Sequence, residues 1–320
     1  MNEITKASRS NSPAAPSGGT AVTDGKFRFV DRLYLVLAIL PLVAGIVINV
    51  LTTPASDGIE VSGALIYFTI PMPFQDLPIT ESQVNTWLVM LSIFFLVKWL
   101  THGLTVRGGS ARQTIVEMIV ETTDKLVDEN MGAKYFAGFA PFIAAVMALS
   151  AFSSLVTLIG LYPPTSDFNV IAGWALIVFV LITYYKCKCG FVHYVKSFGD
   201  PVPLLAPLNV ISEVATPLSM TFRHYGNVLS GVIIEMMIGS ALGSLSNLIL
   251  GWLPGALGKF PLLEIGIPAI LSVYFDIFSG CLQAFIFAML TMLYVSGGFP
   301  ADDWEKLKAK KAAKKAQNAA

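Results

Sequence analysis

Long runs of apolar residues alternate with short polar stretches along most of this chain. The apolar runs occupy residues 33–51, 87–99, 136–161, 168–185, 204–253 and 262–295. A helix needs roughly 20 consecutive apolar residues to cross the hydrocarbon core of a bilayer. The pattern therefore predicts an all-α polytopic membrane protein with about six membrane helices.

The last two runs are too long for upright crossings. No proline follows Pro217 before residue 250, so a single helix there would exceed ~45 Å at 1.5 Å per residue. The hydrocarbon core is only ~30 Å thick. Either this helix breaks near Gly239 or Gly243, or it crosses at a steep tilt. Because a Gly/Pro turn at 252–261 joins the two runs, we expect a steeply tilted hairpin, which requires a partner surface.

Composition supports a membrane protein and excludes other classes. Hydrophobic residues make up 54% of the chain and charged residues 13%, whereas soluble domains are roughly 25% charged. The 21 basic and 21 acidic residues balance, which argues against a nucleic-acid partner. Three cysteines cannot form a disulfide scaffold. No metal-ligand spacing, phosphate loop or nucleophile constellation occurs, so we expect no metal, no cofactor and no enzymatic chemistry.

Charge placement predicts the topology and the domain organisation. Basic residues cluster at 26–32, 107–112, 186–196 and 306–315, whereas 54–84 contains acidic residues but no Lys or Arg. Placing every basic cluster in the cytoplasm requires six crossings with both termini inside. We expect a disordered tail at 1–26, an extra membrane helix at 27–53, an extracytoplasmic loop at 54–84, a membrane domain at 85–300 and a basic cytoplasmic tail at 301–320.

Residues 112–131 form an amphipathic stretch between the second and third runs. Apolar residues such as Ile115 and Ile119 alternate at helical spacing with Glu117, Glu121 and Asp124. This pattern predicts a helix along the inner membrane surface. A solvated helix in a loop is the alternative.

Several ionisable residues lie where a bilayer disfavours charge. An ionised group at the bilayer centre costs at least ~2.5 kcal/mol on insertion scales, and the guanidinium of Arg223 cannot deprotonate. At 100° per residue, four polar residues lie within about 40° of Arg223. They are Thr216, Ser219, Asn227 and Ser230. This polar stripe indicates either an internal salt bridge or a surface where a carboxylate arrives, pairs and leaves.

Three carboxylates and one amide complete the candidate set. Glu213 and Glu235 point to other sides of the Arg223 helix, where they could line water. Asp276 and Gln283 are seven residues apart and share one face of the last helix. A buried carboxyl beside water changes protonation state readily, so Asp276 fits a proton relay. A hydrogen-bonded structural carboxyl is the alternative for Asp276.

Helical geometry also predicts which side of the Arg223 helix approaches the last helix. Val232 lies about 180° from Arg223 on the helical wheel. We therefore expect Val232 to face the helix that carries Asp276, while Arg223 faces away from it.

Two segments resemble subunit a of F-type ATP synthases. Residues Pro207–Gly231 are similar to the family signature, whose Arg-Leu-Phe-Gly-Asn core reads Arg223-His224-Tyr225-Gly226-Asn227 here. Residues 282–294 are similar to the last helix of the family, and the resemblance covers roughly 79–296. Many bacterial members carry Glu nine residues after the essential Arg. This chain has Val232 there, and Glu235 is one turn further along.

This resemblance implies a non-catalytic, multi-pass subunit of the bacterial plasma membrane. It implies a static partner of a rotating c-subunit ring and of the b-subunit peripheral stalk, within an ATP synthase embedded in the lipid bilayer. Two aqueous half-channels carry protons, and the essential Arg between them couples proton flow to ATP synthesis. The implied proton-translocation residues are Arg223, Asn227, Glu213, Glu235, Asp276 and Gln283.

Two other classes of protein compete with this interpretation. A secondary transporter or ion channel could use a buried Arg for an anionic substrate, but it predicts inverted repeats and broken helices in both halves. The chain contains no internal repeat. A purely structural scaffold leaves Arg223, Glu213 and Asp276 unexplained.

Overall fold

The computed structural model describes residues 21–52, 63–73, 75–104, 110–136, 138–199, 202–250 and 270–317. Six helical segments within these ranges are long and apolar enough to cross a membrane, as the hydrophobic pattern predicts. They are Phe29–Thr52, Glu81–Thr101, Ala140–Ile159, Phe168–Cys189, Pro203–Ile249 and Ile270–Gly297.

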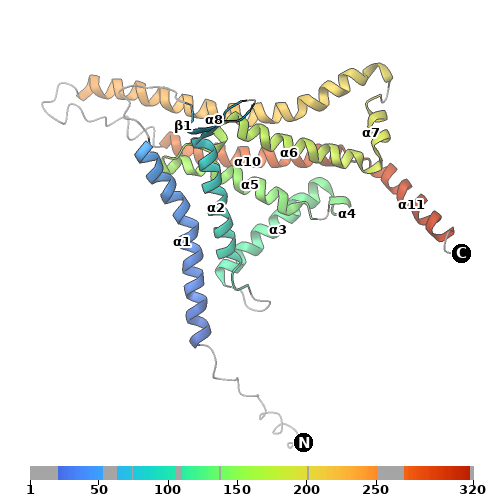
Figure 1. The fold of residues 1–320 in the computed structure, drawn as a ribbon, viewed down its shortest axis with the longest axis horizontal. Helices are drawn as coiled ribbons and strands as arrows, with labels where there is room; N and C mark the ends of the chain where they lie inside the picture. The colour runs from blue at the N-terminus through green and yellow to red at the C-terminus, as the bar shows by residue number, and fades with distance from the viewer. Residues whose placement is uncertain are drawn as a thin grey trace, which may run out of the picture.

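The first two membrane helices form a closely packed pair. Helices α1 (Ala21–Thr52) and α2 (Glu81–Thr101) run side by side (Figure 1). Pro41 lies inside α1 and removes one backbone donor from it. Ser92 of α2 donates a 2.7 Å hydrogen bond to the carbonyl of Ala38, three residues before this proline. Asn49 donates to the carbonyl of Gly160 at 2.6 Å, so α1 is bonded to two other parts of the chain.

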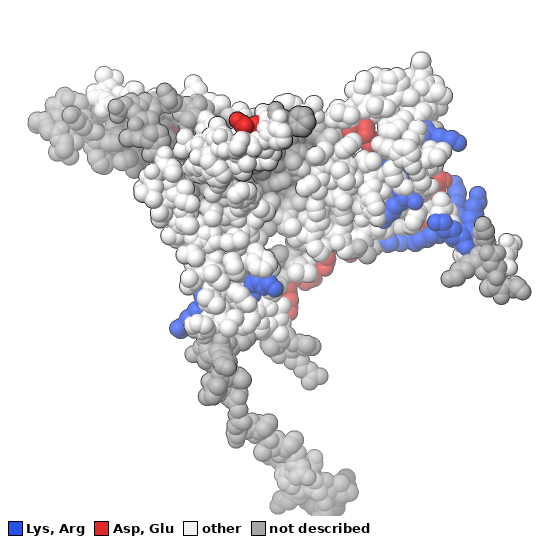
Figure 2. Space-filling model, viewed as in Figure 1, with Lys and Arg blue, Asp and Glu red and all other residues white. Residues whose placement is uncertain are grey.

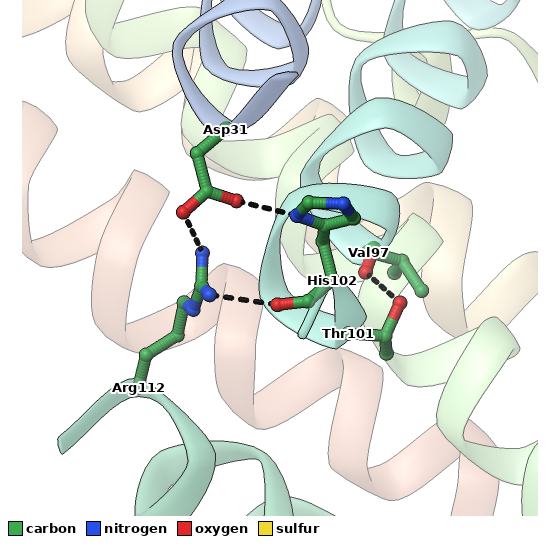
Figure 3. Close-up of polar contacts among 5 residues, drawn as sticks. All are labelled: Asp31, Val97, Thr101, His102 and Arg112. Atoms are coloured by element: carbon green, nitrogen blue, oxygen red, sulfur yellow. Dashed lines mark hydrogen bonds and ion pairs between the residues drawn. The ribbon is translucent and has the colours of Figure 1, made fainter. Parts of the chain in front are cut away.

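A polar contact joins α1 to the end of α2 and the start of α3 (Ala111–Met131) (Figure 3). One oxygen of Asp31 lies 2.9 Å from Nδ1 of His102, and Arg112 donates to the other oxygen at 3.0 Å. Arg112 also donates to the carbonyl of His102 at 2.7 Å. The extra N-terminal helix is therefore fixed to the remainder of the molecule by charge as well as by packing.

Helix α8 (Ala206–Leu250) is a single unbroken helix of 45 residues. At 1.5 Å per residue it is about 68 Å long, more than twice the thickness of a hydrocarbon core. In Figure 1 it runs across the direction of α1 and α2 and bends along its length. Of the two sequence-based alternatives, the break is wrong, since α8 continues through Gly239 and Gly243. An unbroken helix of this length fits a bilayer only at a steep tilt.

Helix α10 (Gly280–Gly297) packs against α5 (Ala140–Leu155), α6 (Phe168–Lys186) and α8, and α6 also packs against α8. Their buried core contains Ile143, Val178, Met220, Phe287 and Met292. Large apolar side chains dominate the outward faces of the same helices. Figure 2 shows a broad central surface with little charge, while most Lys and Arg side chains lie at its right edge and lower left. This distribution suits a body surrounded by lipid.

Short elements complete the fold. Strands β1 (Ile66–Ile70) and β2 (Leu77–Thr80) pair antiparallel, and helices α4 (Ala133–Phe136), α7 (Phe191–Ser197) and α11 (Ala301–Gln317) follow later in the chain. The exposed contact of Glu305 in α11 with Lys134 and Tyr135 holds the pKa of the Glu305 carboxyl below its usual value, chiefly through the hydrogen bond from Lys134.

The structure adds detail to three of the expected segments. Helix α1 begins at Ala21 and so includes the end of the expected disordered tail, because extending an existing helix costs little. The expected loop 54–84 contains the β-hairpin and the start of α2. Residues 273–279 form a π-helix before α10, which hydropathy does not reveal. Residues 1–20 of the expected tail and the expected turn at 252–261 lie outside the described residues.

Candidate functional site

Arg223 lies near the middle of α8, on an exposed side of the helix. It forms no ion pair with any carboxylate of the described residues. Large apolar side chains flank it, with Leu218 49% exposed and Phe222 56% exposed. Within the described part of the chain, an internal salt bridge does not account for Arg223.

The polar stripe around Arg223 divides into two parts. Ser219 and Ser230 are exposed, as is Arg223. Asn227 is half-buried and its amide donates a 3.0 Å hydrogen bond to the hydroxyl of Ser279 in the π-helix. Asn227 therefore joins α8 to the segment that contains Asp276, and the exposed edge of the stripe consists of Arg223 and small hydroxyl residues.

A small cavity lies between α5, α8 and the π-helix, and we name it the Asp276 cavity. Its volume is about 20 Å³, enough for about one water molecule. Its polar lining includes Asp276, Asn227, Thr157 and Thr165, and Val232 also lines it. The hydroxyl of Thr165 is buried without a partner among the described residues, as expected beside water. Val232 thus faces the helix of Asp276, as the helical wheel predicts.

A second carboxylate lies near Asp276. Ser272 donates a 2.6 Å hydrogen bond to one oxygen of Asp276, and Glu235 of α8 lies close enough to interact electrostatically with Asp276. The π-helix and α8 approach closely here, because a Cβ on Gly231 would lie 3.5 Å from the ring of Phe275. The structure therefore brings Glu235 of α8 near Asp276 of the π-helix, although the two residues lie far apart in the sequence.

A larger cavity lies on the other side of Arg223 along α8, and we name it the Glu213 cavity. It measures about 220 Å³ and its lining includes Glu213, Thr216, Lys186, Tyr294 and Gly298. One oxygen of Glu213 accepts a 2.5 Å hydrogen bond from the ammonium of Lys186. The hydroxyl of Tyr194 lies 3.5 Å from the other oxygen. Unlike Asp276, Glu213 is therefore paired with a cation.

The two cavities lie at opposite ends of α6, one of the candidate membrane spans. The Asp276 cavity is bounded by Pro163 and Thr165, just before α6 begins. The Glu213 cavity is bounded by Ile182 and Lys186, in the last turns of α6. Arg223 lies between them along α8, since the Glu213 cavity reaches Thr216 and the Asp276 cavity begins at Asn227.

The candidate Gln283, and His224 beside Arg223, lie away from both cavities. Gln283 is buried in α10, with 4% of its side chain exposed. It does not line either cavity with Asp276, because the intervening π-helix changes the angular step per residue. His224 is fully buried between Trp174 and Phe287. Its Nε2 lies 3.5 Å from the hydroxyl of Ser150, and its Nδ1 has no partner among the described residues.

Sequence reasoning missed two site residues, Lys186 and Thr165. Lys186 belongs to a basic cluster that marks topology, and nothing in its local pattern indicates a partner 27 residues away. Thr165 lies in a Pro-rich connection that resembles an ordinary turn. Only the packing of α6 against α8 places both side chains beside the cavities.

The fold and this arrangement define a class of protein. It is a polytopic helical membrane protein in which a fixed cation on an over-long helix separates two polar cavities. Ionisable residues inside a membrane mark ion pathways. Among the described residues, no group of three or more His, Cys, Asp or Glu could hold a metal ion.

Comparison with known proteins identifies the family. Residues 83–296 match the family model described as ATP synthase A chain. The chain is 28% identical to ATP synthase subunit a of Legionella pneumophila, covering 71% of this chain and 90% of the relative. It is 30% identical to the sodium-ion-specific ATP synthase subunit a of Propionigenium modestum, covering 74% and 85%, respectively. For the subunit a of Desulforamulus reducens the identity is 31%, with 68% and 78% covered.

The chain belongs to the ATP synthase subunit a family. Subunit a is the ion-translocating, non-catalytic stator subunit of the membrane sector of F-type ATP synthase, so the chain is part of that complex and spans a bacterial membrane. Helices α1 and α11 lie outside the matched residues.

Proposed function

We propose that this protein carries protons along two half-channels that meet at Arg223. The observation that carries the proposal is the position of Arg223. It is exposed and has no ion pair within the described residues, and it lies between two polar cavities at opposite ends of α6. A permanent cation there draws an arriving carboxylate into its ionised form. It also repels protons that would cross directly from one cavity to the other.

The partner that brings this carboxylate is the rotating c-subunit ring. Exposed apolar residues of α8 surround Arg223, so the face suits an apolar helical surface with a single acidic group. The length and tilt of α8 fit the side of such a ring, since lipid alone favours modest tilts. The b-subunit peripheral stalk would hold the protein static against this ring.

Each remaining candidate residue has a role in this pathway. Asp276 and Glu235 exchange protons in the half-channel at the Asp276 cavity, and Asn227 positions the wall between that cavity and Arg223. Glu213 lines the second half-channel. Gln283 supports the π-helix from within the core, because its side chain is buried.

The basic clusters orient the pathway. Lys186 and Lys188 lie at the end of α6 that borders the Glu213 cavity, so the positive-inside rule supports a cytoplasmic opening there. Ser82, near the end of the segment 54–84 that contains no Lys or Arg, donates a 2.5 Å hydrogen bond to Asp167 beside the other end of α6. The Asp276 cavity then opens to the extracytoplasmic side, and both chain termini are cytoplasmic.

Substitution of Arg223 tests the proposal. Arg223→Ala should abolish ATP-driven proton pumping in inverted membrane vesicles, while ATP hydrolysis by the soluble sector continues. Arg223→Lys should also fail, because a lysine lacks the planar fork and deprotonates more readily. The exposed Lys196→Gln serves as a matched control for loss of a cation. Pumping by Arg223→Ala at the rate of the unmodified protein would refute the proposal.

A further inference from the structure

The ion pair in the Glu213 cavity is mostly removed from water. Lys186 is the last residue of α6, and its ammonium lies 2.5 Å from Oε2 of Glu213. The side chain of Lys186 is 26% exposed and that of Glu213 is 12% exposed. Removing one partner of such a pair leaves the other as an uncompensated, partly buried charge. The cavity therefore depends on both residues.

The stem of Lys186 occupies space that a missing side chain leaves open. A Cβ on Gly298, just after α10, would lie 2.8 Å from Cε and 3.2 Å from Cγ of Lys186, and 3.2 Å from the carbonyl oxygen of Tyr294. The shortest of these contacts is to the Lys186 side chain. The φ angle of Gly298 is −81°, a value that residues with side chains also adopt. The backbone thus does not require glycine at 298, whereas the path of the Lys186 stem does. Because this stem is flexible, a Cβ at 298 would displace the ammonium and leave the fold intact.

We propose that Lys186 is a positioning residue of the half-channel at the Glu213 cavity, and that Gly298 provides the room for its side chain to reach Glu213. The inference rests on the proposed function. The ion pair holds the Glu213 side chain against α6 and neutralises its charge, so a proton that passes between Arg223 and the cytoplasm by way of Thr216 meets no cation-binding group. An unpaired carboxylate in the same cavity attracts a cation and retains it.

Charge substitutions give the first test, with pumping measured in inverted vesicles that contain the whole synthase. Lys186→Gln should lower the initial rate about tenfold, as expected for loss of a charge-assisted hydrogen bond. Added sodium chloride should slow this variant further relative to choline chloride, because sodium binds the unpaired carboxylate. The exchanged pair Lys186→Glu with Glu213→Lys should recover at least half of the rate. The exposed Lys196→Gln should pump normally.

Two neighbouring glycines give a steric test that removes no charge. Gly298→Ala should slow pumping because its Cβ displaces Lys186. Gly297→Ala should not, since a Cβ at 297 meets nothing within 4 Å. In a Lys186→Ala background, which lacks the displaced atoms, Gly298→Ala should have no further effect. Such non-additivity is the signature of two residues that act through one contact.

Three results would overturn the inference. They are normal pumping by Lys186→Gln in both salts, an exchanged pair no better than Lys186→Gln, and an equal effect of Gly298→Ala with and without Lys186. If Lys186→Gln prevents c subunits from co-purifying with the synthase, the comparison of Gly298→Ala with Gly297→Ala tests the inference instead. Failure of the proposed function itself is distinguishable, because it would appear as normal pumping by Arg223→Ala.

Discussion

The two cavities beside α8 differ in the groups that surround their carboxylates. Asp276 lines the first cavity and accepts a hydrogen bond from Ser272, and a second carboxylate, that of Glu235, lies near it. In the Glu213 cavity, the carboxylate interacts with the ammonium of Lys186. The first cavity measures about 20 Å³ and the second about 220 Å³.

This difference gives the two half-channels different chemistry. Two neighbouring carboxylates cannot both ionise at low cost, so one of them readily holds a proton. A carboxylate paired with a lysine is already neutralised and does not need one. We infer that protons cross the Asp276 cavity by binding to a carboxyl side chain. In the Glu213 cavity, we infer that they move through water beside a carboxylate whose charge is neutralised.

The largest expected effect is the loss of the titrating group at Asp276. Asp276→Asn keeps the size of the side chain but removes proton exchange, so pumping should fall at least about a hundredfold, the scale of a lost acid–base group. Asp276→Glu should retain a substantial part of the rate. Initial rates of vesicle acidification measure both variants. Normal pumping by Asp276→Asn would mean that Asp276 is a structural carboxyl and that the two cavities do not differ as described.

A smaller effect is expected from filling the Asp276 cavity. A Cβ on Gly280 would collide with the side chain of Ser154, and forced overpacking costs about 1–3 kcal/mol. Gly280→Ala should therefore slow pumping about tenfold, and Ser154→Gly in the same protein should restore it. Gly239→Ala is the matched control, because nothing lies within 4 Å of a Cβ there. Failure of Ser154→Gly to restore pumping would show that cavity volume is not the cause.

The smallest effect is expected at His224, which neighbours Arg223 but lines neither cavity. His224→Phe keeps the ring contacts with Trp174 and Phe287 and loses only a 3.5 Å contact with Ser150. Pumping should stay within about twofold of normal, and stability within ~1.5 kcal/mol, as for swaps of similar volume. A collapse of pumping in an assembled synthase would instead make His224 a proton carrier.

Helical periodicity predicted much of this arrangement. A 100° step placed Val232 opposite Arg223, and Val232 lines the Asp276 cavity. The excess length of the fifth run predicted either a break or a steep tilt of α8, and the unbroken helix of 45 residues leaves the tilt, because it cannot stand upright in a bilayer. Both inferences depend only on the geometry of one helix, which sequence specifies well.

Features that depend on two helices were not predictable in this way. The Lys186–Glu213 pair joins α6 to α8, and the Asn227–Ser279 bond joins α8 to the π-helix. Neither register can be derived from hydropathy. The prediction that Gln283 shares a helix face with Asp276 assumed an α-helix from Asp276 onwards. The π-helix that contains Asp276 ends only at Ser279. A local change from α-helix to π-helix depends on packing around the cavity, and the pattern of apolar residues does not reveal it.

Sided labelling tests most directly whether Arg223 separates two half-channels that open to opposite sides. Cys187, Cys189 and Cys281 would first be replaced by serine, since all three are free thiols. Variants with a single cysteine, either Thr216→Cys or Val232→Cys, would then be treated with a membrane-impermeant thiol reagent. The treatment would be done in right-side-out vesicles and in inverted vesicles. We predict labelling of Thr216→Cys only from the cytoplasmic side and of Val232→Cys only from the other side. Labelling of both cysteines from the same side, or of either one from both sides, would contradict the account.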